Sequence, residues 1–157
     1  MERIAMTPGG HAALVQELHH LKDVERRSVI EAIAEARAHG DLKENAEYHA
    51  AKERQSMIEG RIEELEAKLS LAEVIDITQH SGDRVIFGAT VKLYDEASEE
   101  EVVYQIVGED EANIAMGKIS YTAPLARALI GKSAGDEITF VSPGGKKNFE
   151  VLSVLYV

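Results

Sequence analysis

Asp41 and Glu44 are the side chains in this sequence best placed to do chemistry, because they are carboxylates separated by only two residues. Paired carboxylates bind hard cations, and Mg²⁺ takes only one or two of them while phosphates and waters complete its coordination. Alone, the pair is expected to bind Mg²⁺ poorly. Inserted into a phosphate-rich site of another protein, it could complete the second metal position for two-metal phosphodiester chemistry.

The segment that carries this pair also has a purely structural interpretation. Gly40 is suited to end a helix, since glycine adopts positive φ without steric cost. Asp41 and Glu44 have the spacing of a capping box, in which Asp41 caps the next helix and Glu44 occupies its third position. From the pattern alone capping is the commoner explanation, and it does not exclude metal binding by the same carboxylates.

Residues beside this segment are candidates for contact with nucleic acid. Arg37, Lys43 and Lys52 could form a local basic patch for a single RNA strand, although most such charges simply solvate a helix face. Tyr48 lies about one turn into the second helix, where it could touch a base or a sugar. Its alternative role is to pack across the alanine-lined end of the helices.

Two long helices are expected on either side of this segment. Residues from about 10 to about 39 contain no proline and are rich in Ala, Glu, Leu and Arg. On a helical wheel their apolar side chains form a stripe about 120° wide. The stripe comprises Leu14, Leu18, Leu21, Val29, Ala32, Ile33 and Ala36; that of the second helix, from about 45 to about 74, comprises Ala51, Ile58, Ile62, Leu65, Leu69 and Ala72.

Folding these helices back on each other about residues 40–43 aligns the two stripes. The facing pairs are Leu14 with Leu69, Leu18 with Leu65, Leu21 with Ile62, and Ala32 with Ala51. The pattern predicts a long antiparallel α-helical coiled-coil hairpin with arms of roughly 40 Å. Glu25 and Ser28 interrupt the stripe, and its alanines leave the distal half thin. Because both outer faces are charged, we interpret the hairpin as a projecting arm.

The second half of the chain changes to a period of two and is rich in β-branched residues, which favours strands. Strands are expected at 85–87, 89–94, 101–107, 113–116, 138–141 and 149–157, with one short helix at 126–130 after Pro124. The fold class is therefore α+β, with a mostly antiparallel sheet in the second half. The expected domains are the hairpin at 1–76, with an acidic tip at 40–45, and the sheet domain at 84–157, joined by a linker at 77–83.

Composition excludes several classes of function. The 157 residues include no cysteine, which removes disulfide scaffolds, thiol nucleophiles and cysteine-ligated metals. The chain has 28 acidic and 17 basic residues, and a net charge of −11 argues against general nucleic-acid binding. No apolar run approaches the roughly 20 residues of a membrane span, and no secretory signal is recognisable. A soluble, cytoplasmic protein is expected.

Other motifs in the sequence are weaker. Gly131–Lys132–Ser133 is similar to the end of a phosphate-binding loop, but Ala126 stands where that loop needs glycine. The six histidines show no metal-ligand spacing, and no Ser/His/Asp constellation is legible. A plain coiled-coil tether stays open as a function, but it leaves the tip sequence unexplained.

Residues 33–52, IAEARAHGDLKENAEYHAAK, closely resemble the tip of bacterial transcript-cleavage factors of the Gre family. The run 84–91 resembles the entry to the second domain of that family. The runs 124–132 and 143–145 resemble its C-terminal motifs. The match as a whole covers nearly the whole chain, and in combination these motifs are highly specific.

The resemblance implies a specific function. Gre factors bind RNA polymerase that has backtracked and extruded the 3′ end of its RNA. Their coiled coil enters the secondary channel, and their C-terminal domain, similar in fold to FK506-binding proteins, docks at the channel rim. The tip acids help to hold the second catalytic Mg²⁺, and the polymerase's own active site cuts the RNA.

Carried over by position, the resemblance makes Asp41 and Glu44 the acids that share this Mg²⁺ with the polymerase. It makes Arg37 and Lys52 basic-patch residues and Tyr48 a contact for the RNA 3′ end. The chain is thus expected to be an accessory factor rather than an enzyme, with no cofactor of its own, no membrane partner and a monomeric free state. The alternative is a channel-binding regulator that does not stimulate cleavage. A third possibility, a peptidyl-prolyl isomerase, rests only on the implied fold.

Overall fold

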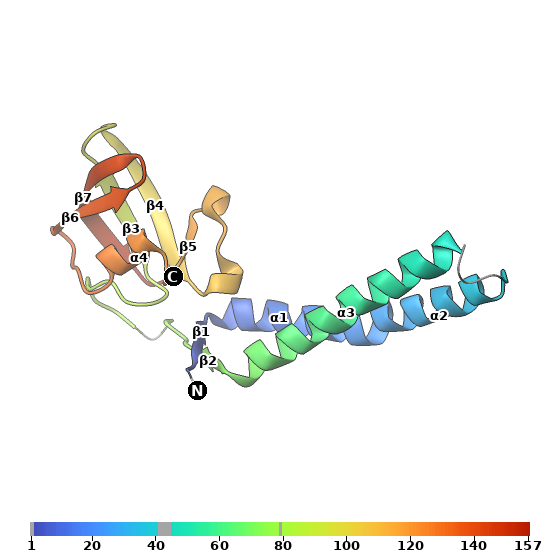
Figure 1. The fold of residues 1–157 in the computed structure, drawn as a ribbon. Helices are drawn as coiled ribbons and strands as arrows, with labels where there is room; N and C mark the ends of the chain where they lie inside the picture. Colours follow the sequence, from blue (N-terminus) through green and yellow to red (C-terminus); the bar gives the residue numbers. More distant parts are fainter. Residues whose placement is uncertain (1, 41–44, 79) are drawn as a thin grey trace. The chain divides into compact units, whose positions relative to one another are not determined.

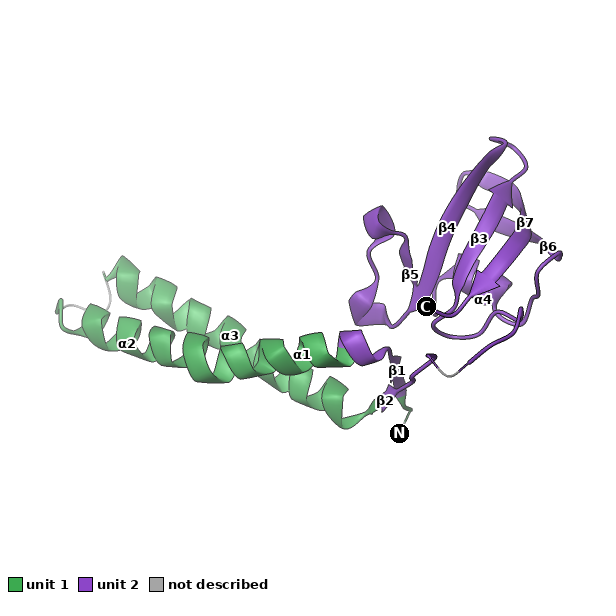
Figure 2. Cartoon of the chain, turned by 180° about the vertical axis from the view of Figure 1, so that it is seen from behind, with its two compact units in different colours: residues 1–3, 11–72 green, residues 4–10, 73–157 purple. Residues whose placement is uncertain are grey.

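The computed structural model describes residues 2–40, 45–78 and 80–157, and its elements divide between two compact units (Figure 1 and Figure 2). The helical unit comprises residues 11–72 with the first residues of the chain, and the sheet unit comprises residues 4–10 and 73–157. Helices fill the N-terminal part and a curled sheet fills the C-terminal part, which confirms the predicted α+β class. The predicted domain bounds and linker stay predictions.

The helical arm consists of α1 (Pro8–His20), a π-helical turn (Leu21–Glu25), α2 (Arg26–Arg37) and α3 (Ala46–Ser70). The prediction of one uninterrupted helix from about 10 to 39 was wrong at the π turn, where the Arg26 N–H donates to the Leu21 carbonyl. A π turn takes in about one residue more than an α turn. One π turn and one α turn together take in about eight residues, which is the spacing of Leu21 and Val29. Both residues therefore face the same side of the helix and pack in one cluster.

The two sides of the arm are held together by a narrow apolar seam. Val29 of α2 packs with Ile58 and Ile62 of α3, and Leu18 and Leu21 cover the same cluster. Val29 is fully buried. α2 and α3 lie side by side and run in opposite directions (Figure 1). Among the described residues of the arm, each helix buries only one stripe of its surface.

Charged pairs join the two sides of the arm along this seam. They are Glu17–Arg61, Arg26–Glu59, Glu25–Arg54 and Lys22–Glu66, with N–O distances of 2.8, 2.7, 2.7 and 3.5 Å. The hydrogen bond from Arg61 lowers the pKa of Glu17 below its ordinary value of 4.5, and that from Arg26 lowers the pKa of Glu59. Hydrogen bonds from Arg54 and then His20 lower the pKa of Glu25.

A five-stranded sheet in the order β5-β4-β3-β7-β6 forms the body of the sheet unit. Its strands are β3 (Thr90–Asp95), β4 (Glu100–Val107), β5 (Lys118–Ser120), β6 (Glu137–Ser142) and β7 (Gly145–Leu155). The pairings are antiparallel except that β4 and β5 run parallel. Ala126 and Leu129 of the short helix α4 (Pro124–Leu129) are fully buried against Val91, Leu93 and Val151 of the sheet core.

Three local predictions were wrong. Residues 85–87 form no strand: Val85 pairs with Gly131 and Lys132, and Arg84 makes an isolated bridge to Ser133, but the pairing does not extend along the chain. The strand expected at 113–116 is a short 3₁₀ helix, Ile114–Met116, followed by β5; another 3₁₀ turn spans Glu109–Glu111. The second long helix stops at Ser70, and β2 (Ala72–Val74) pairs with β1 (Ile4–Met6).

We expect Val29→Ala to lower the free energy of unfolding of the arm by about 2 kcal/mol, because it opens a cavity in a seam with few other buried side chains. Urea unfolding followed by helical circular dichroism measures the loss. Ile30→Ala is the matched control, since Ile30 is the next residue of α2 and 52% exposed. An equal loss of unfolding free energy in the two variants would contradict the conclusion that the seam stabilises the arm.

The cross-arm pairs predict a pH dependence of stability. Because the folded-state pKa values of Glu17 and Glu59 are lowered, the pairs stabilise the fold above about pH 4.5. This contribution disappears as the pH falls through the lowered pKa values. The melting temperature of the native chain should exceed that of Glu17→Gln/Glu59→Gln at about pH 6, and the gap should narrow as the pH falls below about 4.5. Glu53→Gln/Glu63→Gln is the control, in which two exposed acids of α3 are replaced. A difference in melting temperature that persists at low pH, or an equal difference for this control, would contradict a stabilising role of the cross-arm pairs.

Candidate functional site at the end of the helical arm

The distal end of α2 is followed by a short turn that leads to a glycine. The helix ends at Arg37, and Ala38 is its C-cap. The His39 N–H donates to the Ala36 carbonyl at 3.2 Å, and the Gly40 N–H donates to the Arg37 carbonyl at 3.3 Å. Gly40 has a φ of +106°, a conformation that other residues adopt with strain. The predicted positive φ at Gly40 is therefore confirmed, whereas the prediction that Gly40 is the C-cap was wrong by two residues.

Asn45 caps the start of α3 and connects α3 to α2. Its side-chain oxygen accepts from the Tyr48 N–H at 3.0 Å, so Asn45 is the N-cap of α3. Its amide nitrogen donates to the Ala36 carbonyl of α2 at 2.5 Å. The capping prediction that named Asp41 and Glu44 was wrong, because α3 begins four residues later. The signal for Asn45 was present in the sequence, since asparagine is among the best N-cap residues.

Side-chain contacts also hold the end of α2 close to the start of α3. His39 Nδ1, after the end of α2, and the Glu47 carboxylate of α3 lie 3.2 Å apart. Ala36 and Ala51 are buried between the helices, so alanine lines the seam here as predicted. Tyr48 is half-buried, and its ring meets that of His49 edge to face with centroids 5.5 Å apart. The distal end of the arm is therefore narrow.

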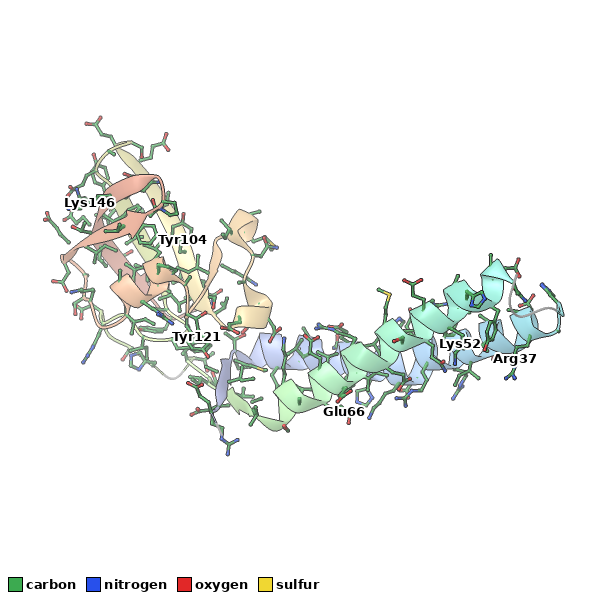
Figure 3. All side chains as sticks on the ribbon, viewed as in Figure 1. Arg37, Lys52, Glu66, Tyr104, Tyr121 and Lys146 are labelled. Carbon is green, nitrogen blue, oxygen red and sulfur yellow. The ribbon has the colours of Figure 1, made fainter. Side chains whose placement is uncertain are left out.

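Two cations of the predicted basic patch are described, and both lie toward this end of the arm (Figure 3). Arg37 is exposed in the last turn of α2. Lys52 is exposed on α3, where its Nζ donates to Gln55 at 3.1 Å. Asp41, Lys43 and Glu44 lie outside the described residues. Their assignment as metal-holding acids and basic-patch residue stays a prediction, as do the RNA-contact roles of Arg37, Tyr48 and Lys52.

Outside this segment the described residues offer little alternative chemistry. Within 2–40, 45–78 and 80–157, no three His, Asp or Glu side chains gather in a group that could hold a metal ion. Over the same ranges, no helix is both long enough and apolar enough to cross a bilayer. The residues before Gly131–Lys132–Ser133 form α4, so the strand that a phosphate-binding loop requires is absent there.

Comparison with known proteins decides the family. A family model described as "Transcription elongation factor, N-terminal" matches residues 4–74. A second, described as "Transcription elongation factor, GreA/GreB, C-term", matches residues 79–156. The chain belongs to the GreA/GreB family of transcription elongation factors. The resemblance found at residues 33–52, 84–91, 124–132 and 143–145 is thereby confirmed.

Relatives named "Transcription elongation factor GreA" match over almost the full length. The protein of Anaeromyxobacter sp. (strain K) is 59% identical over 100% of this chain and 95% of its own. That of Methylococcus capsulatus is 60% identical over 100% of both chains. Both relatives carry the name GreA rather than GreB.

Among solved structures, "Crystal structure of GreA factor homolog 1 (Gfh1) protein of Thermus thermophilus" is 29% identical. The match covers 98% of this chain and 99% of that one, with a TM-score of 0.45. A GreA/GreB factor from Nitrosomonas europaea is 26% identical over 98% of this chain and 100% of that one, with a TM-score of 0.44.

We expect Asn45→Ala to destabilise the arm by about 1 kcal/mol, because it removes the α3 N-cap. Asn45→Asp separates the two bonds, since aspartate keeps the acceptor for the Tyr48 N–H but cannot donate to the Ala36 carbonyl. Thermal unfolding followed at helical wavelengths should rank native, Asn45→Asp and Asn45→Ala in falling order. An Asn45→Ala variant as stable as the native chain would show that the cap contributes nothing.

Proposed function

We propose that this GreA/GreB-family protein inserts its helical arm into the secondary channel of bacterial RNA polymerase. There it stimulates the polymerase's own cleavage of backtracked nascent RNA and so rescues arrested complexes. The observation that carries this proposal is the narrow arm end, where α2 and α3 are tied together at both sides of residues 41–44. Family membership supplies the context in which such an end is useful.

The arm's dimensions suit entry into a narrow passage. It is two helices wide, its distal seam is lined by Ala36 and Ala51, and its outer faces are charged. We describe it as a coiled-coil hairpin, because Val29, Ile58 and Ile62 form an apolar cluster between antiparallel helices. We assign the sheet unit an FK506-binding-protein-like fold and a docking role at the channel rim.

The chemistry proposed for the tip belongs to the carboxylates. Asp41 and Glu44 provide oxygen ligands, which suit Mg²⁺, and as a pair they fit a metal whose other ligands come from polymerase and RNA phosphate. When bound, this metal would activate water and stabilise the phosphodiester transition state. Arg37, Lys43 and Lys52 would hold the RNA backbone near the site, and Tyr48 would contact its 3′ end.

On this proposal the protein is an accessory factor, because the RNA phosphodiester bond is broken in the active site of the polymerase. Its partners are RNA polymerase and the 3′ end of backtracked RNA, and it acts in the cytoplasm as a monomer when free. The net charge of −11 fits recruitment by a protein surface better than binding to free nucleic acid.

We expect Asp41→Asn/Glu44→Gln to reduce stimulated cleavage at least about a hundredfold, because the variant loses the charge that holds the metal in the transition state. The assay uses a backtracked polymerase complex with 3′-labelled RNA and Mg²⁺, and it measures release of short 3′ fragments. Polymerase binding, measured separately, should be unchanged.

Glu53→Gln is the matched control, since Glu53 is an exposed acid of α3 that lies close to the tip in the sequence. This variant should leave cleavage close to the native rate. Binding without fragment release by the native chain would instead identify a non-cleaving regulator of the same channel. Native cleavage by Asp41→Asn/Glu44→Gln would overturn the role given to the tip acids.

A further inference from the structure

The π turn Leu21–Glu25 is the point at which the apolar seam is interrupted. The turn contributes no buried side chain, and Val24 within it is 51% exposed. On this side of the arm, the next fully buried residue is Val29 of α2. π turns are rare and are found mostly as single turns within α-helices, frequently at functional sites.

Charge takes the place of apolar packing around this turn. Arg54 of α3 donates to Glu25 at 2.7 Å, and His20 lies 3.3 Å from the same carboxylate. Arg26 donates two hydrogen bonds to Glu59, at 2.7 and 2.8 Å. These pairs are about a third to nearly a half exposed. Exposed ion pairs stabilise weakly and are screened by salt.

The extra residue in the turn has little effect on the path of the helix. About five residues of π helix turn the chain through roughly the angle of four residues of α helix. Val29 therefore returns to the seam whether or not the extra residue is present. Its consequence is local: after Leu21, which packs on the Val29–Ile58–Ile62 cluster, the turn is joined to α3 by exposed charged pairs.

We infer that residues 21–26 form a flexible joint in the arm, clamped by Glu25–Arg54 and Arg26–Glu59. Opening of the clamp lets the distal half of the arm bend without breaking the Val29–Ile58–Ile62 cluster. The benefit of the joint rests on the proposed function, since an arm that enters a channel must adjust its course to seat its tip. The clamp opens more readily as ionic strength rises.

Hydrogen exchange of the free full-length chain tests the joint directly. The amides of 22–26 should exchange at least about tenfold faster than those of 29–33, and the difference should grow in about 0.5 M NaCl. Glu25→Gln/Arg26→Gln should speed exchange at 22–26 and leave α3 beyond residue 62 unchanged. Equal exchange in the two segments would overturn the inference.

Deleting Val24 tests what the joint does. The deletion shortens the Leu21–Val29 spacing to seven residues, which fits a continuous α-helix, so exchange at 22–26 should fall to the level of 29–33. Stimulated cleavage should fall at least about fivefold while polymerase binding is retained. Val24→Ala, which keeps the chain length, should behave as the native protein does.

The two failures are distinguishable. If the native chain does not stimulate cleavage, the proposed function fails, and the exchange measurement still decides whether the joint exists. If the native chain and the Val24 deletion stimulate cleavage equally, the proposed function stands and the joint has no role in it.

Discussion

A narrow apolar seam between two antiparallel helices is the constraint on which the rest of the arm depends. Two helices alone can bury only one stripe each, so Val29, Ile58 and Ile62 stabilise a structure that is otherwise solvated. A third helix would provide a larger core but would also thicken the arm. A slender shape therefore comes with low intrinsic stability, and every further interaction of the arm compensates for that.

The compensation differs along the arm. Near its base Leu14 and Leu65 are buried, whereas around the π turn charged pairs join the two sides, and at the far end small alanines let the backbones approach. Asn45 then bonds to α2 and α3 at once. The sheet unit has no such difficulty, because its strands and α4 enclose a conventional core.

On the proposed function, the two units have separate tasks. The sheet unit has a buried core and would dock, while the helical unit would carry the chemistry. The described residues next to the tip are fixed by hydrogen bonds, since Asn45 caps α3 and bonds to α2. An isolated carboxylate pair is a poor Mg²⁺ site, so the proposed role of Asp41 and Glu44 depends on a partner that supplies the other ligands.

The helical stripes and the alternation along the strands could be predicted from the sequence, because periodic spacing can be read without knowledge of distant neighbours. The positive φ at Gly40 and the family resemblance were predicted from residue types in short motifs. The π turn, the cap at Asn45, the β1–β2 pair and the loss of the strand at 85–87 became apparent only in the folded chain. The π turn depends on a single extra residue, and the other features depend on hydrogen-bond partners or packing neighbours elsewhere in the chain. Local propensity cannot specify which of these partners a residue will have.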